Sequence, residues 1–306
     1  MKILFVRIND KIGDTVIETF FYRELKRLFP KAHLTVMCCG DQTILNEVPY
    51  VDELILLPAG GIRKIATAFK KLPFIWKQKY DLLISFTPHW RMKFFNAFVS
   101  AARKEFFDFL PGMHVSVAYE HVLKNLGQTE INTHYEIPLP ASARQAADLW
   151  LLQNNLQDKP FLFFNPSGGD KNRTLGVAQV NEILREMGDL PIVLSDVHQQ
   201  YPVKGPQVIS VSGIDILQTA ALVNKAAYIL TVDTAIAHIA EAFDKPMTVL
   251  FSLKNYAGCP AQDLSLLTVW GPRGPRVQKL HHAHAVCEIP AREIATTVLQ
   301  NWTQEK

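Results

Sequence analysis

The sequence predicts an α/β protein with doubly wound parallel sheets, divided between two domains. Short apolar runs alternate with helix-like segments over most of the chain, a pattern typical of parallel sheets covered by helices. Both halves open in the same way, with a strand-like run and a polar turn, at residues 2–14 and 161–174. The 306 residues, 48% of them hydrophobic, are enough for two ordinary cores. We expect domains at residues 1–150 and 151–306.

Composition excludes several classes of protein. The net charge of +3 gives no reason to expect nucleic-acid binding, and the apolar stretches have the length of strands rather than of membrane helices. The chain runs from Met1 directly into a strand-like segment without a small-residue cleavage site, so a secretory signal is not expected. The four cysteines form no C-x-x-C pair. We therefore expect a cytoplasmic protein with reduced thiols.

The first half is predicted to contain strands at residues 2–8, 33–39, 51–57 and 80–86, and helices at 15–29 and 41–47. The longer helix starts with Thr15-x-x-Glu18, a capping-box pattern, and stops at Pro30. The turn before it lacks the G-x-G-x-x-G pattern of dinucleotide-binding proteins. It instead offers Asp14 at the mouth of the sheet. Asp14 is either a functional carboxylate or an acid that only stabilises the helix dipole.

Residues 63–104 mix basic and aromatic side chains and contain one acid, Asp81. Such a surface can settle on an anionic membrane or hold an acidic acceptor. The alternative is a pair of ordinary amphipathic helices with a basic solvated face and aromatic rings in the core. The residues concerned are Arg63, Lys64, Phe69, Lys70, Lys71, Phe74, Trp76, Lys77, Lys79, Trp90, Arg91, Lys93, Phe94, Phe95, Phe98, Arg103 and Lys104.

In the second half we expect helices at residues 141–156, 175–187, 214–224 and 235–243, and strands at 161–165, 191–194, 208–211, 228–232 and 247–251. Residues 105–140 give no clear pattern beyond the Pro111-Gly112 turn and an extended stretch at 134–140.

Two segments of the second half suggest an anion site. In the turn at 165–174, Ser167, Gly168 and Gly169 allow backbone N–H groups to approach an anion, and Lys171 and Arg173 add positive charge. A glycine-rich turn with flanking charges is also common in ordinary loops.

The second segment, 231–238, combines a strand, a tight turn and a helix start. Asp233 and Thr234 are good N-cap residues. The helix N-terminus would face the carboxyl edge of the sheet, where phosphate binds favourably. Together the two segments predict a site for a nucleotide diphosphate.

A metal centre is not expected. His281, His282 and His284 lie close together in the sequence, but no thiol or carboxylate constellation supports them. The chain has no Asp-x-Asp pair to hold a divalent ion against a diphosphate. A diphosphate would therefore be stabilised by cationic side chains and helix dipoles, with no cofactor.

With these residues, the chain resembles the bacterial heptosyltransferases of glycosyltransferase family 9. Four stretches carry the resemblance, and they occur in the family's order. They are Lys-Ile-Leu-Phe-Val-Arg-Ile at 2–8 with the Gly13-Asp14 turn, Val-Pro-Tyr-Val-Asp-Glu-Leu-Ile at 48–55, the loop at 165–173, and residues 231–251 with their Val-Asp-Thr-x-x-x-His spacing.

The resemblance implies a GT-B fold, in which two Rossmann-like domains face a central cleft. The N-terminal domain would bind the acceptor, and the C-terminal domain the nucleotide-sugar donor. It also implies an inverting, metal-independent transfer of heptose from ADP-heptose to the inner core of lipopolysaccharide. Such an enzyme would work at the cytoplasmic face of the inner membrane, with residues 63–104 on the lipid.

The resemblance also implies roles for individual residues. Asp14 would be the general base for the acceptor hydroxyl. Lys171 or Arg173 would stabilise the departing diphosphate, and Thr234 and the N–H of Ala235 would bind it. Asp233 would brace this loop, since two anions in contact repel. His238 would either reach the ligand or pack beneath it.

Departures from the family pattern keep two other readings open. Ala235 and Ser252 replace glycines that are usual in the family, and Lys171-Asn-Arg-Thr-Leu175 replaces its Lys-Arg-Trp-Pro-like run. Residues 195–198 (Ser-Asp-Val-His) replace a glycine-and-acid pattern in the segment that lines the nucleoside pocket. The alternatives are a glycosyltransferase that uses another nucleotide sugar for capsule or glycan synthesis, and a non-catalytic protein that binds a nucleotide sugar.

Overall fold

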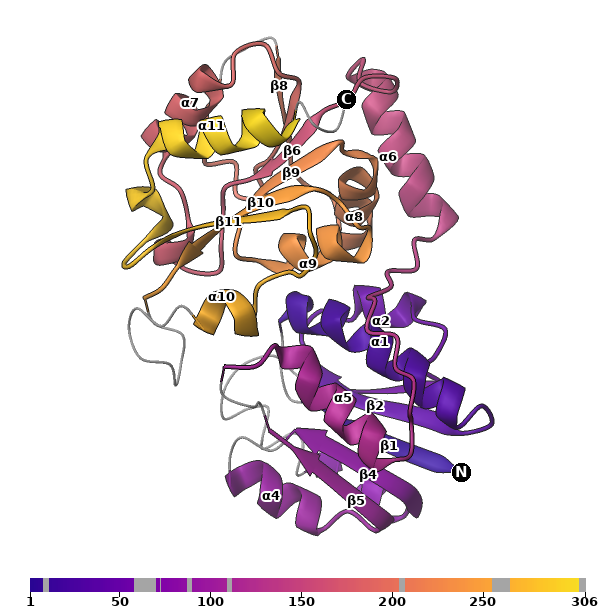
Figure 1. Ribbon diagram of the computed structural model, residues 1–306. Helices are drawn as coiled ribbons and strands as arrows, with labels where there is room; N and C mark the ends of the chain where they lie inside the picture. The colour runs from indigo at the N-terminus through magenta and orange to yellow at the C-terminus, as the bar shows by residue number, and fades with distance from the viewer. Residues whose placement is uncertain are drawn as a thin grey trace. The chain divides into compact units, whose positions relative to one another are not determined.

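Two compact units make up the computed structural model, which describes residues 1–7, 11–57, 70–71, 73–86, 90–108, 112–203, 207–254 and 265–302 (Figure 1). The units are Met1–Pro138 and Leu139–Lys306. The boundary expected at residue 150 falls inside helix α6, Ala141–Gln153, which belongs entirely to the second unit. The division lies earlier because α6 packs against helix α8 (Ile216–Lys225) of the second unit.

The first unit is a five-stranded parallel sheet with the order β3-β2-β1-β4-β5. The chain moves outward from β1 to β3 and then returns to the other side of β1 with β4. The order therefore reverses between β1 and β4, the position where ligands bind in open α/β sheets. Its elements are β1 (Lys2–Val6), α1 (Ile12–Leu28), β2 (His33–Cys39), α2 (Thr43–Glu47), β3 (Glu53–Leu57), β4 (Tyr80–Phe86), α4 (Trp90–Ala97), β5 (Ala101–Phe107) and α5 (Val115–Asn125).

The second unit repeats this topology with one more strand, in the order β11-β10-β9-β6-β7-β8. Here the order reverses between β6 and β9. After α6 come β6 (Leu162–Asn165), the 3-10 turn η1 (Lys171–Arg173), α7 (Val177–Glu186), β7 (Ile192–Ser195), β8 (Val208–Val211), α8, β9 (Tyr228–Val232), α9 (Ala235–Ala242), β10 (Met247–Ser252), α10 (Ser265–Val269), β11 (Val277–His282), the 3-10 turn η2 (Val286–Glu288) and α11 (Ala291–Trp302).

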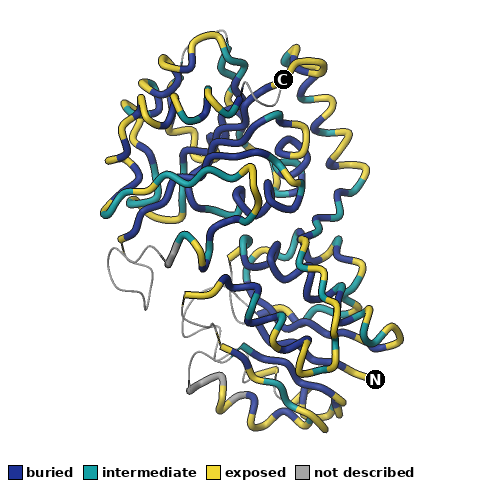
Figure 2. The backbone as a smooth tube through the Cα atoms, in the orientation of Figure 1, coloured by how far each residue is buried: buried dark blue, intermediate teal, exposed yellow. Residues whose placement is uncertain are grey.

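The central strands of both sheets are buried on their two faces, as Figure 2 shows. The edge strands β5, β8 and β11 are partly exposed. Successive side chains of a strand point to opposite faces. In β1, Phe5 packs against α1, with its ring 5.4 Å from that of Phe21, whereas Leu4 and Val6 join a cluster with Ile75 on the other face. In the second unit, α7 and α11 cover one face of the sheet, and α8 and α9 cover the other (Figure 1).

The predicted fold class is confirmed, and the strands predicted at 33–39, 80–86, 208–211 and 228–232 match the observed bounds. Apolar runs of strand length identify these strands. For the inner strands the reason is burial on both faces, whereas β8 lies at the edge and is only partly buried. Strand β5 was missed, since its sequence, Ala-Ala-Arg-Lys-Glu-Phe-Phe, is polar and it lies at the edge of the sheet.

The capping box predicted at Thr15 and Glu18 is wrong. Helix α1 begins at Ile12, and Lys11 is its N-cap, without a side-chain hydrogen bond. Thr15 and Glu18 lie inside the helix and both contact Arg7 instead, at 2.8 Å each. The pattern predicted that Thr15 and Glu18 would bond to the backbone at the helix start, but both side chains instead bind the buried guanidinium of Arg7.

Candidate active site

The second unit gathers polar side chains at its switch point, where β6 and β9 end side by side. Asn165, the last residue of β6, pairs in register with Thr231 of β9. Its side-chain amide donates to the hydroxyl groups of Thr231 and Thr234, at 3.1 Å each, and lies 3.2 Å from the carbonyl oxygen of Ser167. One buried amide thus ties together the loops that follow the two strands.

Helix α9 starts at this point, as predicted. Thr234 is its N-cap, and the Thr234 hydroxyl accepts a hydrogen bond from the N–H of Ile236 at 3.3 Å. The first N–H groups of a helix have no acceptor within it, and they carry the positive end of the helix dipole. Thr234 and Ala235 are half-buried, so this helix start remains accessible to an anion.

The glycine loop that follows β6 folds back on itself. The N–H of Leu175 donates to the carbonyl oxygen of Pro166 at 2.9 Å, and the N–H of Gly168 donates to the Thr174 hydroxyl at 3.1 Å. A Cβ at Gly168 would lie 2.3 Å from the carbonyl oxygen of Arg173, and one at Gly169 would lie 3.1 Å from an Arg173 guanidinium nitrogen. The glycines therefore allow the loop to pack on Arg173.

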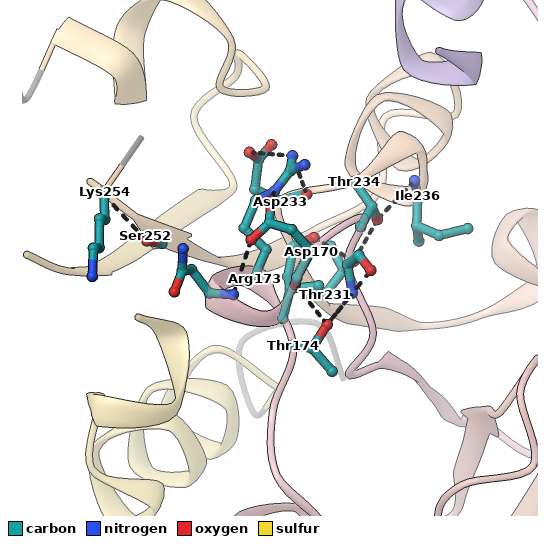
Figure 3. Close-up of polar contacts among 12 residues, drawn as sticks. Asp170, Arg173, Thr174, Thr231, Asp233, Thr234, Ile236, Ser252 and Lys254 are labelled. Atoms are coloured by element: carbon teal, nitrogen blue, oxygen red, sulfur yellow. Dashed lines mark hydrogen bonds and ion pairs between the residues drawn. The ribbon is translucent and has the colours of Figure 1, made fainter. Parts of the chain in front are cut away.

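The two cations of this loop differ in their contacts. Figure 3 shows those of Arg173, which donates from Nε to Asp170 at 2.7 Å and whose Nη1 lies 3.5 Å from a carboxylate oxygen of Asp233. Burial works against ionisation of Asp170, but the hydrogen bond and charge of Arg173 lower the pKa of Asp170 below its ordinary value. Lys171 is exposed and makes no hydrogen bond or ion pair with the described residues.

Asp233 is buried and contacts Arg173 from the turn between β9 and α9. His238, one helical turn further, is also buried, with Nδ1 3.9 Å from the carboxylate of Glu241. Glu241 in turn accepts from Nε of Arg273 at 3.0 Å. Burial tends to raise the pKa of Glu241, but His238 and Arg273 lower it overall. An ionised Glu241 therefore lies within ion-pair distance of both His238 and Arg273.

The loop after β7 also reaches this site. Its backbone is held by Asp196, whose carboxylate oxygens accept the N–H groups of Gln200 and Tyr201 at 2.9 and 3.0 Å. Gln200 then donates to the Ser167 hydroxyl at 2.8 Å, and the hydroxyl of Tyr201 lies 3.2 Å from the same atom. Ser167 thus joins the glycine loop to the loop that follows β7, a contact that sequence reasoning missed along with Asn165, Asp170 and Thr174.

In the first unit, Asp14 lies in the first turn of α1 and is buried. The turn follows β1, at the edge where the strand order reverses. Sequence reasoning placed Asp14 at this edge but missed its neighbours. The nearest signals were an arginine at the end of an apolar run and a glutamate four residues after Asp14.

Those neighbours form a buried ionic network. Nε of Arg7 lies 2.8 Å from Glu18, and the two side chains are 4% and 2% exposed. The hydroxyl groups of Tyr22 and Tyr119 donate to the two oxygens of Glu18, at 2.8 Å each. Burial raises the pKa of Glu18 to about 7, against the lowering effects of Arg7 and the tyrosines. Burial also works against the charge of Arg7, but Glu18 raises its pKa overall.

Among the residues that the structure describes, no group of three or more His, Cys, Asp or Glu side chains is arranged to hold a metal ion. His282 contacts Glu288 at 3.5 Å, and its ring lies 5.9 Å from that of His284. None of the described helices is long and apolar enough to cross a membrane.

The basic-aromatic region is described only in part, since residues 58–69, 72 and 87–89 lie outside the described ranges, and with them Arg63, Lys64 and Phe69. Its described rings Phe74, Trp76, Phe94 and Phe98 are between 42% and 50% exposed, so they are surface residues rather than core. The ring of Phe98 lies 5.6 Å from that of Trp76 and 4.8 Å from that of Phe94. Exposed lysines flank this cluster at positions 70, 71, 77, 79 and 93.

Comparisons with known proteins agree with the resemblance. The model of the family "Glycosyltransferase family 9 (heptosyltransferase)" matches residues 206–280. A protein of Escherichia coli (strain K12) named "Putative lipopolysaccharide heptosyltransferase 4" is 21% identical over 324 residues, covering 96% of this chain and 85% of the relative.

Solved structures share the fold. A glycosyl transferase of family 9 from Veillonella parvula DSM 2008 has a TM-score of 0.77 and 16% identity, covering 99% of this chain and 97% of its own. The ADP-heptose lps heptosyltransferase II of E. coli has a TM-score of 0.74 and 14% identity, covering 100% and 99%. The resemblance, the GT-B fold and the assignment as a glycosyltransferase are thus confirmed.

Proposed function

We propose that the protein is an inverting, metal-independent glycosyltransferase that moves heptose from ADP-heptose to an acceptor of the lipopolysaccharide inner core. The observation that carries this proposal is the meeting of the glycine loop and the start of α9 at the switch point of the second unit. That geometry suits the diphosphate of a nucleotide sugar. The names of the E. coli relatives support heptose, ADP and lipopolysaccharide as the chemistry.

In this proposal the second unit holds the donor. The N–H groups and hydroxyl at Thr234 and Ala235 bind the diphosphate, together with the backbone N–H groups of Ser167 and Gly169. Gly168 lets the backbone approach, while its own N–H donates to Thr174. Lys171 neutralises the leaving group, because it is exposed and has no partner among the described residues that would have to be released first. Arg173 holds the loop against Asp170 and Asp233 and contributes longer-range positive charge.

The first unit holds the acceptor and supplies the base. The acceptor hydroxyl attacks the anomeric carbon, and its proton passes to the carboxylate of Asp14. The bond between that carbon and the diphosphate oxygen breaks, and its electron pair stays with the diphosphate. Lys171 and the dipole of α9 offset this negative charge, so the step needs no metal ion. Attack from the side opposite the leaving group inverts the anomeric carbon.

A second candidate differs only in the donor. The segment after β7 is Ser195-Asp-Val-His198, and in the structure Asp196 is buried and used to hold the backbone of Gln200 and Tyr201. An acid committed to the backbone is less able to bind a ribose. Ala235 also adds a methyl group at the diphosphate site. These features favour a test of other nucleotide sugars, with capsule or glycan as the acceptor.

A panel of donors tests the proposal. Thermal shifts are measured with ADP-, GDP- and UDP-sugars, since a ligand that binds only the folded state raises the melting temperature. Transfer is then measured with the donor that binds. We expect ADP-heptose to give the largest shift and to support transfer. Selective binding of a GDP- or UDP-sugar would contradict ADP-heptose as the donor and favour a glycosyltransferase that uses another nucleotide sugar. Binding of a donor without transfer or donor hydrolysis would indicate a non-catalytic protein.

We also propose that the enzyme works at the cytoplasmic face of the inner membrane, because its acceptor would be a glycolipid. The basic-aromatic surface of the first unit, formed by Trp76, Phe94 and Phe98 with the lysines around them, would contact anionic lipid. Exposed aromatic rings insert at the level of the headgroups, and lysines add electrostatic attraction.

A further inference from the structure

We propose that Arg7 is a positioning residue that fixes the turn carrying Asp14, so that the Asp14 carboxylate meets the acceptor hydroxyl in a single orientation. The inference rests on the proposed role of Asp14 as the general base. It goes beyond that role by assigning a function to a buried ion pair that touches neither donor nor acceptor in the proposed mechanism.

The three guanidinium nitrogens of Arg7 each have a different partner. Nε lies 2.8 Å from Glu18, Nη1 donates to the hydroxyl of Thr15 at 2.8 Å, and Nη2 donates to the carbonyl oxygen of Lys11 at 2.8 Å. Lys11 and Thr15 stand on either side of Asp14, at the N-cap and in the first turn of α1. Arg7 therefore binds the chain on both sides of Asp14.

The contacts of Arg7 matter for the start of α1 because that start has no side-chain cap of its own. The N-cap residue Lys11 makes no side-chain hydrogen bond to the helix. An uncapped first turn frays readily, since its N–H groups have no acceptor. A guanidinium only donates, so Arg7 cannot accept from these N–H groups. Arg7 instead holds the first turn from outside the helix, by donating to the carbonyl oxygen of Lys11 and the hydroxyl of Thr15.

Arg7 is itself held by strands and helices of the first unit. The backbone N–H of Arg7 donates to Met37 of β2 at 2.8 Å. Glu18 lies one turn after Asp14 and is held by Tyr22 of α1 and Tyr119 of α5. A buried arginine needs such a counter-charge, because desolvation of an uncompensated ion is costly. Contacts with β2, α1 and α5 thus restrain Arg7, and through it the first turn of α1.

The network also acts on Asp14 through charge. The charge of Asp14 influences Arg7, Glu18 and Tyr119, which places the four groups in one electrostatic unit. Arg7 is therefore linked to Asp14 by charge as well as through the chain on either side of it.

The decisive variant is Arg7→Lys. An ammonium group keeps the charge opposite Glu18, but it lacks the planar fork that reaches three partners at once. We expect kcat to fall by about tenfold or more, because small misplacements of a catalytic group are costly. We expect the dissociation constant of the donor to stay within about twofold. Amide hydrogen exchange of residues 12–16 should become faster, while exchange of β2 stays unchanged.

Arg23→Lys is the matched control. Arg23 also lies in the first unit, on α1, and bridges Glu136 and the carbonyl oxygens of Asn132 and His134. Its loss should lower the melting temperature as much as Arg7→Lys does, or more, while kcat stays within about twofold of the wild type.

Thr15→Val serves if Arg7→Lys does not fold. It removes the hydrogen bond from Nη1 and the longer one, 3.5 Å, from the Thr15 hydroxyl to the Lys11 carbonyl oxygen, and it leaves the ion pair in place. It should accelerate exchange at residues 12–16 and lower kcat by about threefold or more.

If Arg7→Lys, or this variant in its place, keeps wild-type kcat and wild-type exchange, Arg7 is structural and the inference fails while the proposed function stands. If the wild type transfers no sugar from any donor, the proposed function fails, and the exchange measurement alone then decides whether Arg7 holds the turn.

Discussion

Nη1 of Arg173 lies 3.5 Å from the carboxylate of Asp233 and 3.4 Å from its carbonyl oxygen, although the two residues are 60 positions apart in the chain. The contact joins the glycine loop after β6 to the turn between β9 and α9 (Figure 3). It separates the roles of the loop's two cations. Arg173 is committed to two acids, Asp170 and Asp233, whereas Lys171 is exposed.

The first prediction follows from this difference. Lys171→Ala should leave the melting temperature within about 1 °C of the wild type and lower kcat by about a hundredfold, the cost of one donor to a developing anion. Arg173→Ala should instead lower the melting temperature and weaken donor binding, because Asp170 and Asp233 lose their shared partner. Thermal shifts and steady-state kinetics measure both effects.

Lys159→Ala is the control for this pair, since Lys159 is exposed and precedes β6, at the opposite edge of the sheet. It should behave as the wild type. Equal kinetic losses in Lys171→Ala and Arg173→Ala without a loss of stability would show that both cations face the ligand.

The second prediction concerns Gly168. A methyl group there would lie 2.3 Å from the backbone oxygen of Arg173, an atom that cannot move away alone. Gly168→Ala should therefore destabilise the second unit by about 2 kcal/mol or more, the usual cost of overpacking. Gly169→Ala is the matched control, because its methyl group would meet only the flexible end of the Arg173 side chain. Urea unfolding compares the two, and equal midpoints would contradict the proposed packing role.

The third prediction tests the base. Asp14→Asn keeps the shape of the side chain and removes its ability to take a proton. It should lower kcat by about a thousandfold, within the range for general bases, while donor binding in the thermal-shift assay is unchanged. Asp41→Asn provides the control, since Asp41 is an exposed acid that follows the neighbouring strand β2. Near-normal turnover of Asp14→Asn would remove Asp14 from the mechanism.

The sequence was sufficient for the strands and for the arrangement of the second site, because both are encoded locally. Tyr228–Val232 is an apolar run followed by a good N-cap, so β9, Thr234 and α9 were predicted together. The contacts within the first unit were not local. Tyr119 is 101 residues from Glu18, and no pattern in either segment reveals that they meet.

Local patterns also misled where a distant group competed. The Thr15-x-x-Glu18 motif is a valid capping box by itself, but Arg7 binds both of its side chains in the fold. In the glycine loop, the sequence suggested an anion as the reason for the glycines, and that role stays a prediction. It did not reveal a second reason, which is that the backbone of Arg173 passes where a side chain at Gly168 would lie.

The fourth prediction follows from the buried Glu18. Its pKa is raised by burial, from an ordinary value of 4.5 to about 7 in the folded protein. The folded state therefore holds this proton more tightly than the unfolded chain. The stability that Glu18 contributes is fully present below about pH 4.5 and is lost as the pH rises through about 7, by up to about 3 kcal/mol in total.

Urea unfolding between about pH 5 and pH 8 checks this sign. The free energy of unfolding of the wild type should fall with rising pH more steeply than that of Glu18→Gln, which cannot ionise. Glu18→Gln also removes the counter-charge of Arg7 where Glu18 is ionised, above about pH 7, so the comparison uses the slopes. Parallel pH profiles would mean that Glu18 does not titrate in this range.

The last prediction concerns the basic-aromatic surface of the first unit. We expect the protein to cosediment with anionic vesicles and to be released as salt is raised from about 0.1 M to 1 M, since salt screens the attraction of exposed lysines. The double variant Trp76→Ala with Phe98→Ala should bind more weakly at both salt concentrations, because it removes two rings in contact that are 45% and 42% exposed.

The control for a general loss of surface hydrophobicity is a second double variant, Leu149→Ser with Leu152→Ser. It changes two exposed leucines of α6 in the second unit. Binding that resists high salt, or that weakens equally in both double variants, would show that this surface is not the lipid contact.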